Sequence, residues 1–136
     1  MIGTLNDDLF KSYKYMKNLL RHFSFSQHPH DLYISSLLRE VVSLTRSTIM
    51  IVQQEVVAKR RLRHVLAILS RSYVAFANAF HEWKMSAKLR DPANIQLILQ
   101  REQTAKLIDK HLKLSIPEIE KMFSKEVLRG IVRNRR

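Results

Sequence analysis

The scarcity of helix-breaking residues is the strongest constraint on how this chain folds. Only 2 glycines and 3 prolines occur among its 136 residues, and both residue types interrupt helices. Five segments carry apolar residues at the spacing of three and four that buries one face of a helix. The sequence therefore predicts an all-α fold, namely an antiparallel four-helix bundle with an additional short C-terminal helix and a basic tail.

The first two helices are bounded by the apolar spacing and by one proline. The first is expected over about 5–21, where a single apolar stripe is continuous. Pro29 disfavours helix at the residue before it, so the second helix is expected to begin at Asp31, a good N-cap residue. The apolar stripe of the second helix is expected to reach Val56.

The next two helices are separated by a cap signal. The third helix is expected over about 58–88, with an apolar stripe rich in aromatic residues. Asp91 can cap the helix that follows, and Pro92 suits its first position. The fourth helix is therefore expected over about 92–113.

A further start signal lies at 115–118, where Ser-Ile-Pro-Glu combines a first-turn proline with an acid. A short fifth helix is expected from there to about Leu128, with Gly130 as its stop and a basic tail after it. The sequence thus predicts a four-helix bundle over 1–114 and a short helix with a basic tail over 115–136.

Positive charge dominates the composition. The net charge is +12, from 24 Lys and Arg against 12 Asp and Glu, and a polyanionic partner would relieve the self-repulsion of such an excess. Segment 58–91 holds eight Lys and Arg and two acids, half of the net charge. Its densest run is KRRLRH at 59–64. Basic residues at this density most often meet a polyanion, because each neutralised phosphate releases counterions.

The candidate nucleic-acid-binding residues lie off the apolar stripe of the third helix or in the tail. Arg and Lys on a helix flank hold a phosphate backbone without reading bases, so specificity would come from RNA shape or from a partner. The aromatic residues of this helix fall on its apolar stripe, so no stacking platform is expected. RNA is the expected ligand, with DNA as an alternative. The candidate residues are Lys59, Arg60, Arg61, Arg63, His64, Arg71, Lys84, Lys88, Arg90, Arg133, Arg135 and Arg136.

No catalytic constellation is visible. The chain has no cysteine, and the GxSxG, P-loop and HExxH motifs are absent. His28 and His30 could touch a metal together, but two loop nitrogens make a weak site. We therefore expect a protein that is not an enzyme, with no cofactor, no metal ligands and no catalytic residues.

The expected location is cytoplasmic. No signal-peptide pattern is visible, and charges interrupt every long apolar stretch, so no helix is expected to cross a membrane. The lack of cysteine is compatible with a reducing compartment. A basic amphipathic helix lying on anionic lipid is a minor alternative.

The order of elements resembles the accessory variability determinant (Avd) family of diversity-generating retroelements, which is related to the four-helix proteins encoded in intervening sequences of bacterial 23S rRNA genes. In LFKSYKYMKNLLRHFSFSQHPHDLYISSLLREVVSL (9–44), a first helix ends in an aromatic and a short Ser/Pro loop leads to a long second helix. Phe23, Ser26 and Leu32 take those places. The segment VAKRRLRHVLAILSRSYVAFANAFHEW (57–83) matches the family's basic start of a third helix, and 92–113 matches its shorter fourth helix.

This resemblance implies a homopentameric, barrel-like assembly with a positive surface. Such an assembly binds nucleic acid and associates with a reverse transcriptase, which carries out cDNA synthesis while the accessory protein has no catalysis of its own. Carried over to this sequence, the resemblance places five basic residues against template RNA: Lys59, Arg60, Arg61, Arg63 and Arg71.

Three other interpretations remain open. A small helical subunit of a CRISPR effector also lines nucleic acid with basic helices. A helical-bundle ribonuclease of the HEPN type would need an Arg followed by a His, for which Arg21 with His28, or Arg60 with His64, are the candidate pairs. The last interpretation is a purely structural bundle with no polyanionic partner.

Overall fold

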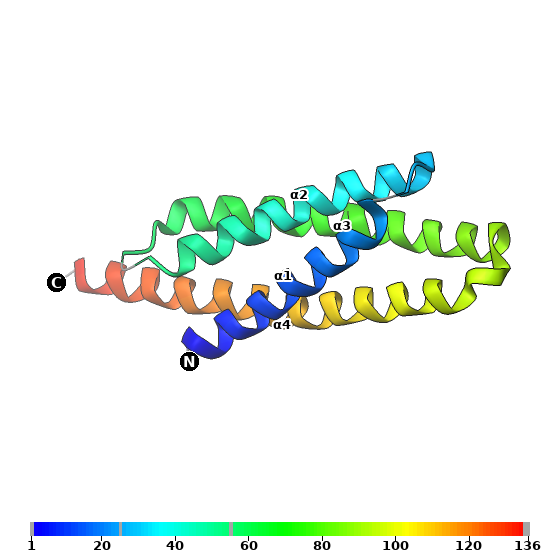
Figure 1. The fold of residues 1–136 in the computed structure, drawn as a ribbon. Helices are drawn as coiled ribbons and strands as arrows, with labels where there is room; N and C mark the ends of the chain where they lie inside the picture. The colour runs from blue at the N-terminus through cyan, green and yellow to red at the C-terminus, as the bar shows by residue number, and fades with distance from the viewer. Residues whose placement is uncertain (1, 25, 55, 135–136) are drawn as a thin grey trace.

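The structure is a computed structural model of the chain. It describes the backbone of 2–24, 26–54 and 56–134, and the side chains within 7–123 except those of residues 25 and 55. Successive helices run in opposite directions along the bundle (Figure 1). The helices are α1 (Ile2–Ser24), α2 (Pro29–Val52), α3 (Lys59–Arg90) and α4 (Ile95–Asn134), with a 3-10 turn, η1 (Pro92–Asn94), before α4. The predicted all-α four-helix bundle is confirmed, and the part of the chain that the structure describes contains no strand.

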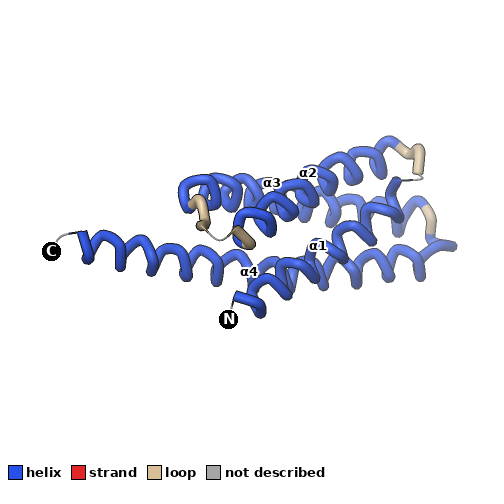
Figure 2. Tube along the Cα trace, turned by 60° about the vertical axis from the view of Figure 1, so that its left-hand side comes forward, coloured by secondary structure: helices blue, strands red, loops and turns tan. Residues whose placement is uncertain are grey.

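The helices close into a four-membered ring in cross-section. α1 packs against both α2 and α4, α2 packs against α3, and α3 meets α4 over a smaller surface. α1 and α3 are thus diagonal neighbours, and α1 crosses the bundle obliquely (Figure 1). The C-terminal end of α4 extends beyond the other three helices (Figure 2).

The core is built from the predicted apolar stripes. Leu9, Met16 and Phe23 of α1 are fully buried at the expected spacing. Phe23 meets the ring of Trp83 edge-on, with ring centroids 5.0 Å apart, and Phe80 stacks on Trp83 at 5.3 Å. Burying each such side chain contributes roughly 1.5–3 kcal/mol, so this aromatic cluster ties α1 to α3 across the middle of the bundle.

The start of α2 differs from the expectation. His28, not Asp31, is its N-cap: the backbone of His28 is extended, with φ −67° and ψ 132°, and its side chain accepts a hydrogen bond from the amide of His30. Pro29 occupies the first helical position, where its missing N–H costs nothing. The stripe of α2 also ends earlier than expected, because the helix stops at Val52 and Val56 is 85% exposed in the following loop.

The predicted separate fifth helix is wrong. α4 continues through Pro117 and past Gly130, so neither the start signal at 115–118 nor the glycine interrupts it. The apolar stripe stays in phase across the proline, with Leu112, Ile119 and Phe123 all buried. Packing of that stripe outweighs the cost of an internal proline, about 3 kcal/mol. Among the described helices, none is both long and apolar enough to traverse a lipid bilayer.

Candidate nucleic-acid interface

The first turn of α3 carries several basic side chains at the helix N-terminus, which is itself partially positive. Lys59, Arg60 and Arg61 open the helix, no acid lies in this turn, and the N-cap Ala58 makes no side-chain hydrogen bond. The amides of a helix's first turn have no partner within the helix, and its N-terminus carries about half a positive charge. Each basic residue here is unfavourable by roughly 0.3–1 kcal/mol. A bound anion would interact favourably with both the helix start and the basic side chains and so offset this cost.

The next turns extend this positive surface along one face of α3. Arg60, His64 and Arg71 lie on the same side of the helix, because their spacings of four and seven residues match whole turns. The side chains are exposed, as is Arg63 beside them. From Arg60 to Arg71 the helix rises about 17 Å. We call this surface the α3 basic face, which consists of Arg60, Arg61, Arg63, His64 and Arg71.

The arginines of the α3 basic face are not neutralised within the described chain. Three described ion pairs link α3 to other helices, through Lys84, Lys88 and Arg90 near its C-terminal end. None of the described ion pairs joins Arg60, Arg61, Arg63 or Arg71 to a carboxylate. Lys59 stands apart from this set, since its side chain is half-buried and has an interaction partner. Four arginines are therefore exposed with their charges available.

The basic residues at the far end of α3 have a different environment. Lys84 and Lys88 lie 3.6 Å and 3.9 Å from the two carboxylate oxygens of Glu102 on α4, and Lys106 lies 3.6 Å from one of them. Burial opposes ionisation of Glu102, but the three ammonium groups outweigh it and hold its pKa below the ordinary value. Lys84 and Lys88 therefore join α3 to α4, and their charges are partly neutralised by Glu102, which weakens their attraction for an external anion.

Arg90 is also paired within the chain. Its guanidinium contacts both ring nitrogens of His28, at 3.1 Å and 2.9 Å, and lies 3.8 Å from the carboxylate of Asp31.

The structure does not bring the predicted residues together as one surface, because the two ends of α3 are about 45 Å apart. Of the predicted tail residues, Arg133 lies in α4 with its side chain outside the described set, and Arg135 and Arg136 lie outside the described residues.

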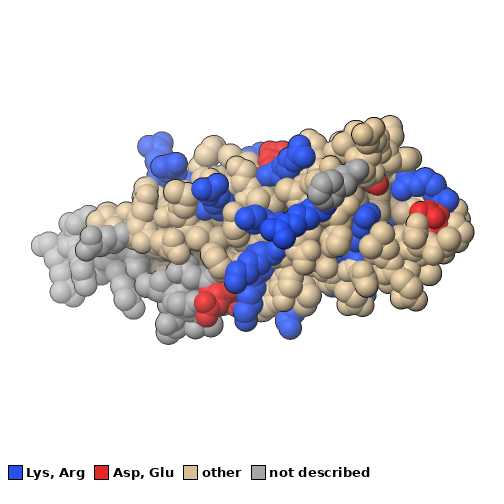
Figure 3. Space-filling view, viewed as in Figure 1, with Lys and Arg blue, Asp and Glu red and all other residues tan. Residues whose placement is uncertain are grey.

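A second positive surface lies on α1 and was not predicted from the sequence. Lys and Arg gather over α1 on the face shown in Figure 3, with few acids among them. Lys11, Lys14, Lys17 and Arg21 are all exposed, and we call these four residues the α1 basic stripe. Their spacing of three and four residues is a helical signal in the sequence itself. The prediction for this segment rested on its apolar stripe and its cap, and these two features do not indicate a basic surface.

Two aromatic rings lie among the lysines of the α1 basic stripe. The ammonium of Lys14 is 5.0 Å from the ring centre of Phe10, and that of Lys17 is 5.5 Å from the ring centre of Tyr13. Phe10 is 44% exposed, whereas Tyr13 is half-buried. On α3, Phe76, Phe80 and Trp83 are buried on the apolar stripe, whereas on α1 the exposed ring of Phe10 lies beside basic residues.

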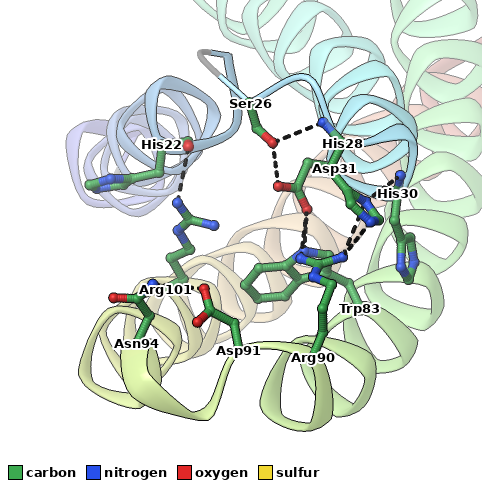
Figure 4. Close-up of polar contacts among 10 residues, drawn as sticks. All are labelled: His22, Ser26, His28, His30, Asp31, Trp83, Arg90, Asp91, Asn94 and Arg101. Atoms are coloured by element: carbon green, nitrogen blue, oxygen red, sulfur yellow. Dashed lines mark hydrogen bonds and ion pairs between the residues drawn. The ribbon is translucent and has the colours of Figure 1, made fainter.

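A buried polar junction joins the loop before α2 to α3 (Figure 4). Asp31, only 6% exposed, accepts hydrogen bonds from the Ser26 hydroxyl and from the Trp83 indole N–H, both at 2.6 Å. Carboxylates are strong acceptors, and buried ones need such partners. Asp31 therefore fixes the α1–α2 connection against the C-terminal part of α3.

Arg101 of α4 completes this junction. It donates a hydrogen bond to the carbonyl of His22, which lies in the last turn of α1, at 3.1 Å. Its guanidinium also lies over the rings of Phe23 and Trp83, at 4.8 Å and 5.4 Å. Burial lowers the pKa of Arg101, and the charge of Asp31 offsets part of that effect. These contacts join α1, α3 and α4, although the buried Nε of Arg101 has no hydrogen-bond partner among the described residues.

The described residues give no support to metal or ribonuclease chemistry. Within the described part of the chain, no group of three His, Asp or Glu could hold a metal ion. His28 pairs with Arg90 rather than with Arg21, the residue that a HEPN-type site would require. His64 is exposed on the α3 basic face one turn from Arg60, and nothing described there would orient it as a base.

One cavity opens where α3 and α4 meet over their smaller surface. Its volume is about 340 Å³, and Tyr73, Phe76, His81 and Lys106 are among its lining residues. The Tyr73 hydroxyl donates a 2.6 Å hydrogen bond to Asp109. Burial, and then this hydrogen bond and the charge of Asp109, raise the pKa of Tyr73 above its ordinary value. The hydroxyl thus stays protonated and joins the two helices.

In comparisons with known proteins, no family model, no curated protein and no solved structure matches this chain.

Proposed function

We propose that this protein is a non-catalytic accessory protein that binds RNA through the α3 basic face. One observation carries the proposal: Arg60 and Arg61 are exposed in the first turn of α3, this turn contains no acid, and the N-cap Ala58 makes no side-chain hydrogen bond. That arrangement costs stability in the free protein. A phosphate backbone at this helix start would pair with the arginines and with the free amides together.

The interaction is electrostatic and does not read sequence. Arg side chains grip phosphates through a planar fork of donors, and the four arginines of the α3 basic face span about 17 Å. If each contacts one phosphate of a single strand, the logarithm of the affinity falls with the logarithm of salt concentration with a slope of about −3. RNA shape, or a protein partner, would supply specificity.

The partner and the assembly are proposed from the resemblance alone. The Avd-like order of elements implies a reverse transcriptase as partner and a homo-oligomer, a pentamer, as the working form. In such a ring each protomer would contribute one α3 basic face, so that structured RNA is held near the polymerase at several points. Native mass spectrometry of the free protein tests this part, since a closed ring supports it and a monomer contradicts it.

The RNA-binding proposal is tested by charge reversal on α3. In the triple variant Arg60→Glu, Arg61→Glu, Arg63→Glu we expect RNA affinity at physiological salt to fall by at least about a hundredfold, because attraction becomes repulsion at three positions. Circular dichroism should show unchanged helicity. Unchanged RNA affinity in this variant would refute the proposal.

A matched control makes the same change in net charge elsewhere. The variant Lys110→Glu, Lys113→Glu, Lys121→Glu alters three exposed lysines of α4, and it should retain most of the affinity. An equal loss in both variants would mean that binding follows net charge rather than the α3 basic face. Incubation with labelled RNA tests the absence of catalysis: cleavage that disappears on His28→Ala or His64→Ala would make the protein a ribonuclease.

A further inference from the structure

We infer that the α1 basic stripe is a second binding surface, for single-stranded RNA, and that one bundle can therefore bridge two RNA segments. The inference rests on the proposed function only for the other end of the bridge, the α3 basic face. The α1 surface itself stands on observations that are independent of α3.

The first observation is the arrangement of charge on α1. Lys11, Lys14, Lys17 and Arg21 follow one exposed side of the helix over about 15 Å. Along a duplex a strand carries one phosphate per roughly 3.4 Å, so four phosphates there span about 10 Å. The longer row of four cations therefore matches a strand that is more extended than in a duplex. No acid occurs on α1 after Asp8, and no described ion pair engages any of the four residues.

The second observation is the exposed aromatic ring within the stripe. Phe10 is 44% exposed, and Lys14 holds its ammonium 5.0 Å from the ring centre. Single-strand sites combine a positive track with aromatic rings on which unpaired bases stack. A base stacked on Phe10 would leave its phosphate close to Lys14. This pairing of ring and cation favours an unpaired strand over a duplex, whose bases are already stacked.

The third observation separates RNA from a lipid surface as the occupant. An interfacial helix inserts a row of large apolar side chains into the membrane. Phe10 is the only large hydrophobic residue that is exposed on the described part of α1. The apolar stripe of α1, including Leu9 and Met16, is buried in the bundle. The exposed side of α1 therefore offers charge and one ring, which suits a nucleic acid strand.

Bridging follows from where the two surfaces lie. α1 and α3 are diagonal in the bundle and meet only through core side chains such as Phe23 and Trp83, so the exposed side of each helix faces away from the other helix. Each helix is about 10–12 Å across, which places two helix layers between the two surfaces. α2 adds Arg39 and Arg46, both exposed. One extended strand could not follow both surfaces without wrapping the bundle.

The experiment measures bridging and single-strand binding separately. An unlabelled single-stranded RNA is fixed to beads, and a second, fluorescent single-stranded RNA is added with or without the full-length protein. The native protein should retain the fluorescent RNA on the beads, and in solution it should saturate at two short RNAs per protomer. The variant Lys11→Gln, Lys14→Gln, Lys17→Gln, Arg21→Gln should lose retention and saturate at one, with helicity kept because glutamine is a good helix former.

Two further variants separate the possible failures. Phe10→Ala should weaken the α1 site by about tenfold, the effect of losing one stacked base. The variant Arg60→Gln, Arg61→Gln, Arg63→Gln should also lose retention while keeping one RNA on α1. If the α1 variant still retains the fluorescent RNA and still binds two RNAs per protomer, the inference is wrong. This holds for a monomer and for an oligomer, because bridging would then not need the α1 basic stripe. If only the α3 variant is unaffected, the proposed function is wrong while the α1 site stands.

A vesicle arm distinguishes the sources of phosphate. Phosphatidylserine vesicles are incubated with the native protein and with the α1 variant, and sedimentation is measured. Native protein that sediments with vesicles through the α1 basic stripe but does not bind RNA there would overturn the inference in favour of a membrane surface. Failure to sediment, together with RNA retention on beads, supports RNA as the occupant.

Discussion

The hydrogen bond from Trp83 to Asp31 is expected to be among the strongest single interactions in the bundle. It joins a fully buried indole N–H to a carboxylate oxygen at 2.6 Å, and Asp31 itself is 6% exposed. A hydrogen bond to an ionised acceptor contributes about 1.5–3 kcal/mol when buried. Breaking it from one side leaves the other group without a partner, so the loss exceeds the contribution of the bond itself.

A double-mutant cycle isolates this bond. Asp31→Ala removes the acceptor and leaves the indole N–H unpaired, for an expected loss of about 3–5 kcal/mol. For a chain of this length that loss lowers the melting temperature by about 10–20 °C. Trp83→Phe removes the donor but keeps an aromatic ring in the core. In the Trp83→Phe background, Asp31→Ala should cost about 1.5–3 kcal/mol less, and this difference is the coupling energy.

The four proteins are compared by urea unfolding followed by circular dichroism, with the slope of the transition checked for each. A control cycle pairs Trp83→Phe with Glu40→Ala. Glu40 is exposed on the same helix as Asp31 and accepts a hydrogen bond from Ser72 instead, so its coupling to Trp83 should lie within about 0.5 kcal/mol of zero. A coupling of that small size between Asp31 and Trp83 would refute the assigned contact.

Two further predictions concern α4. Pro117→Ala should raise the free energy of unfolding by about 1–3 kcal/mol, because the carbonyl of Lys113 regains a hydrogen-bond partner. Urea unfolding measures this change, and an unchanged free energy of unfolding would indicate that the helix is broken at the proline. Glu102→Gln should destabilise the protein at neutral pH but not in acid, because the pKa of Glu102 is lowered in the folded state. The stability that this carboxylate contributes is present above the unfolded-state pKa, about 4.3, and is lost as pH falls through the folded-state pKa. Thermal melts from pH 7 to pH 3 of this variant and of the control Glu82→Gln, whose carboxylate makes no ion pair among the described residues, test this; a destabilisation that persists unchanged at pH 3 would contradict it.

The helical architecture was predictable because it depends on local patterns. The buried stripe of α1 and the aromatic stripe of α3 follow from the spacing of apolar residues alone, and both are confirmed. The errors arose where tertiary packing decides. Pro117 is a start signal in isolation, but the buried residues Leu112 and Ile119 on either side of it continue one stripe and hold the helix together.

The candidate interface was predictable only in part, for a related reason. The run at 59–64 identifies a basic helix start, but sequence does not say which cations find a carboxylate from another helix. Lys84 and Lys88 meet Glu102, which follows them by at least 14 residues and lies on a different helix. From the sequence, Asp31 was expected to be the N-cap of the second helix. Only the fold reveals that the side chain of Trp83, 52 residues away in the sequence, donates a hydrogen bond to it.

The pairing of α1 with α4 has a consequence for how the protein emerges from a ribosome. α1 packs extensively against α4, but about 70 residues separate the end of α1 from the start of α4. At about 5–20 residues per second, synthesis leaves some 4–14 s during which only α2, and then the α2–α3 hairpin, can shelter the apolar side of α1. Newly made chains therefore pass through a three-helix stage in which Leu9 and Met16 lack their final cover. The closing of the bundle must wait for the last helix to be made.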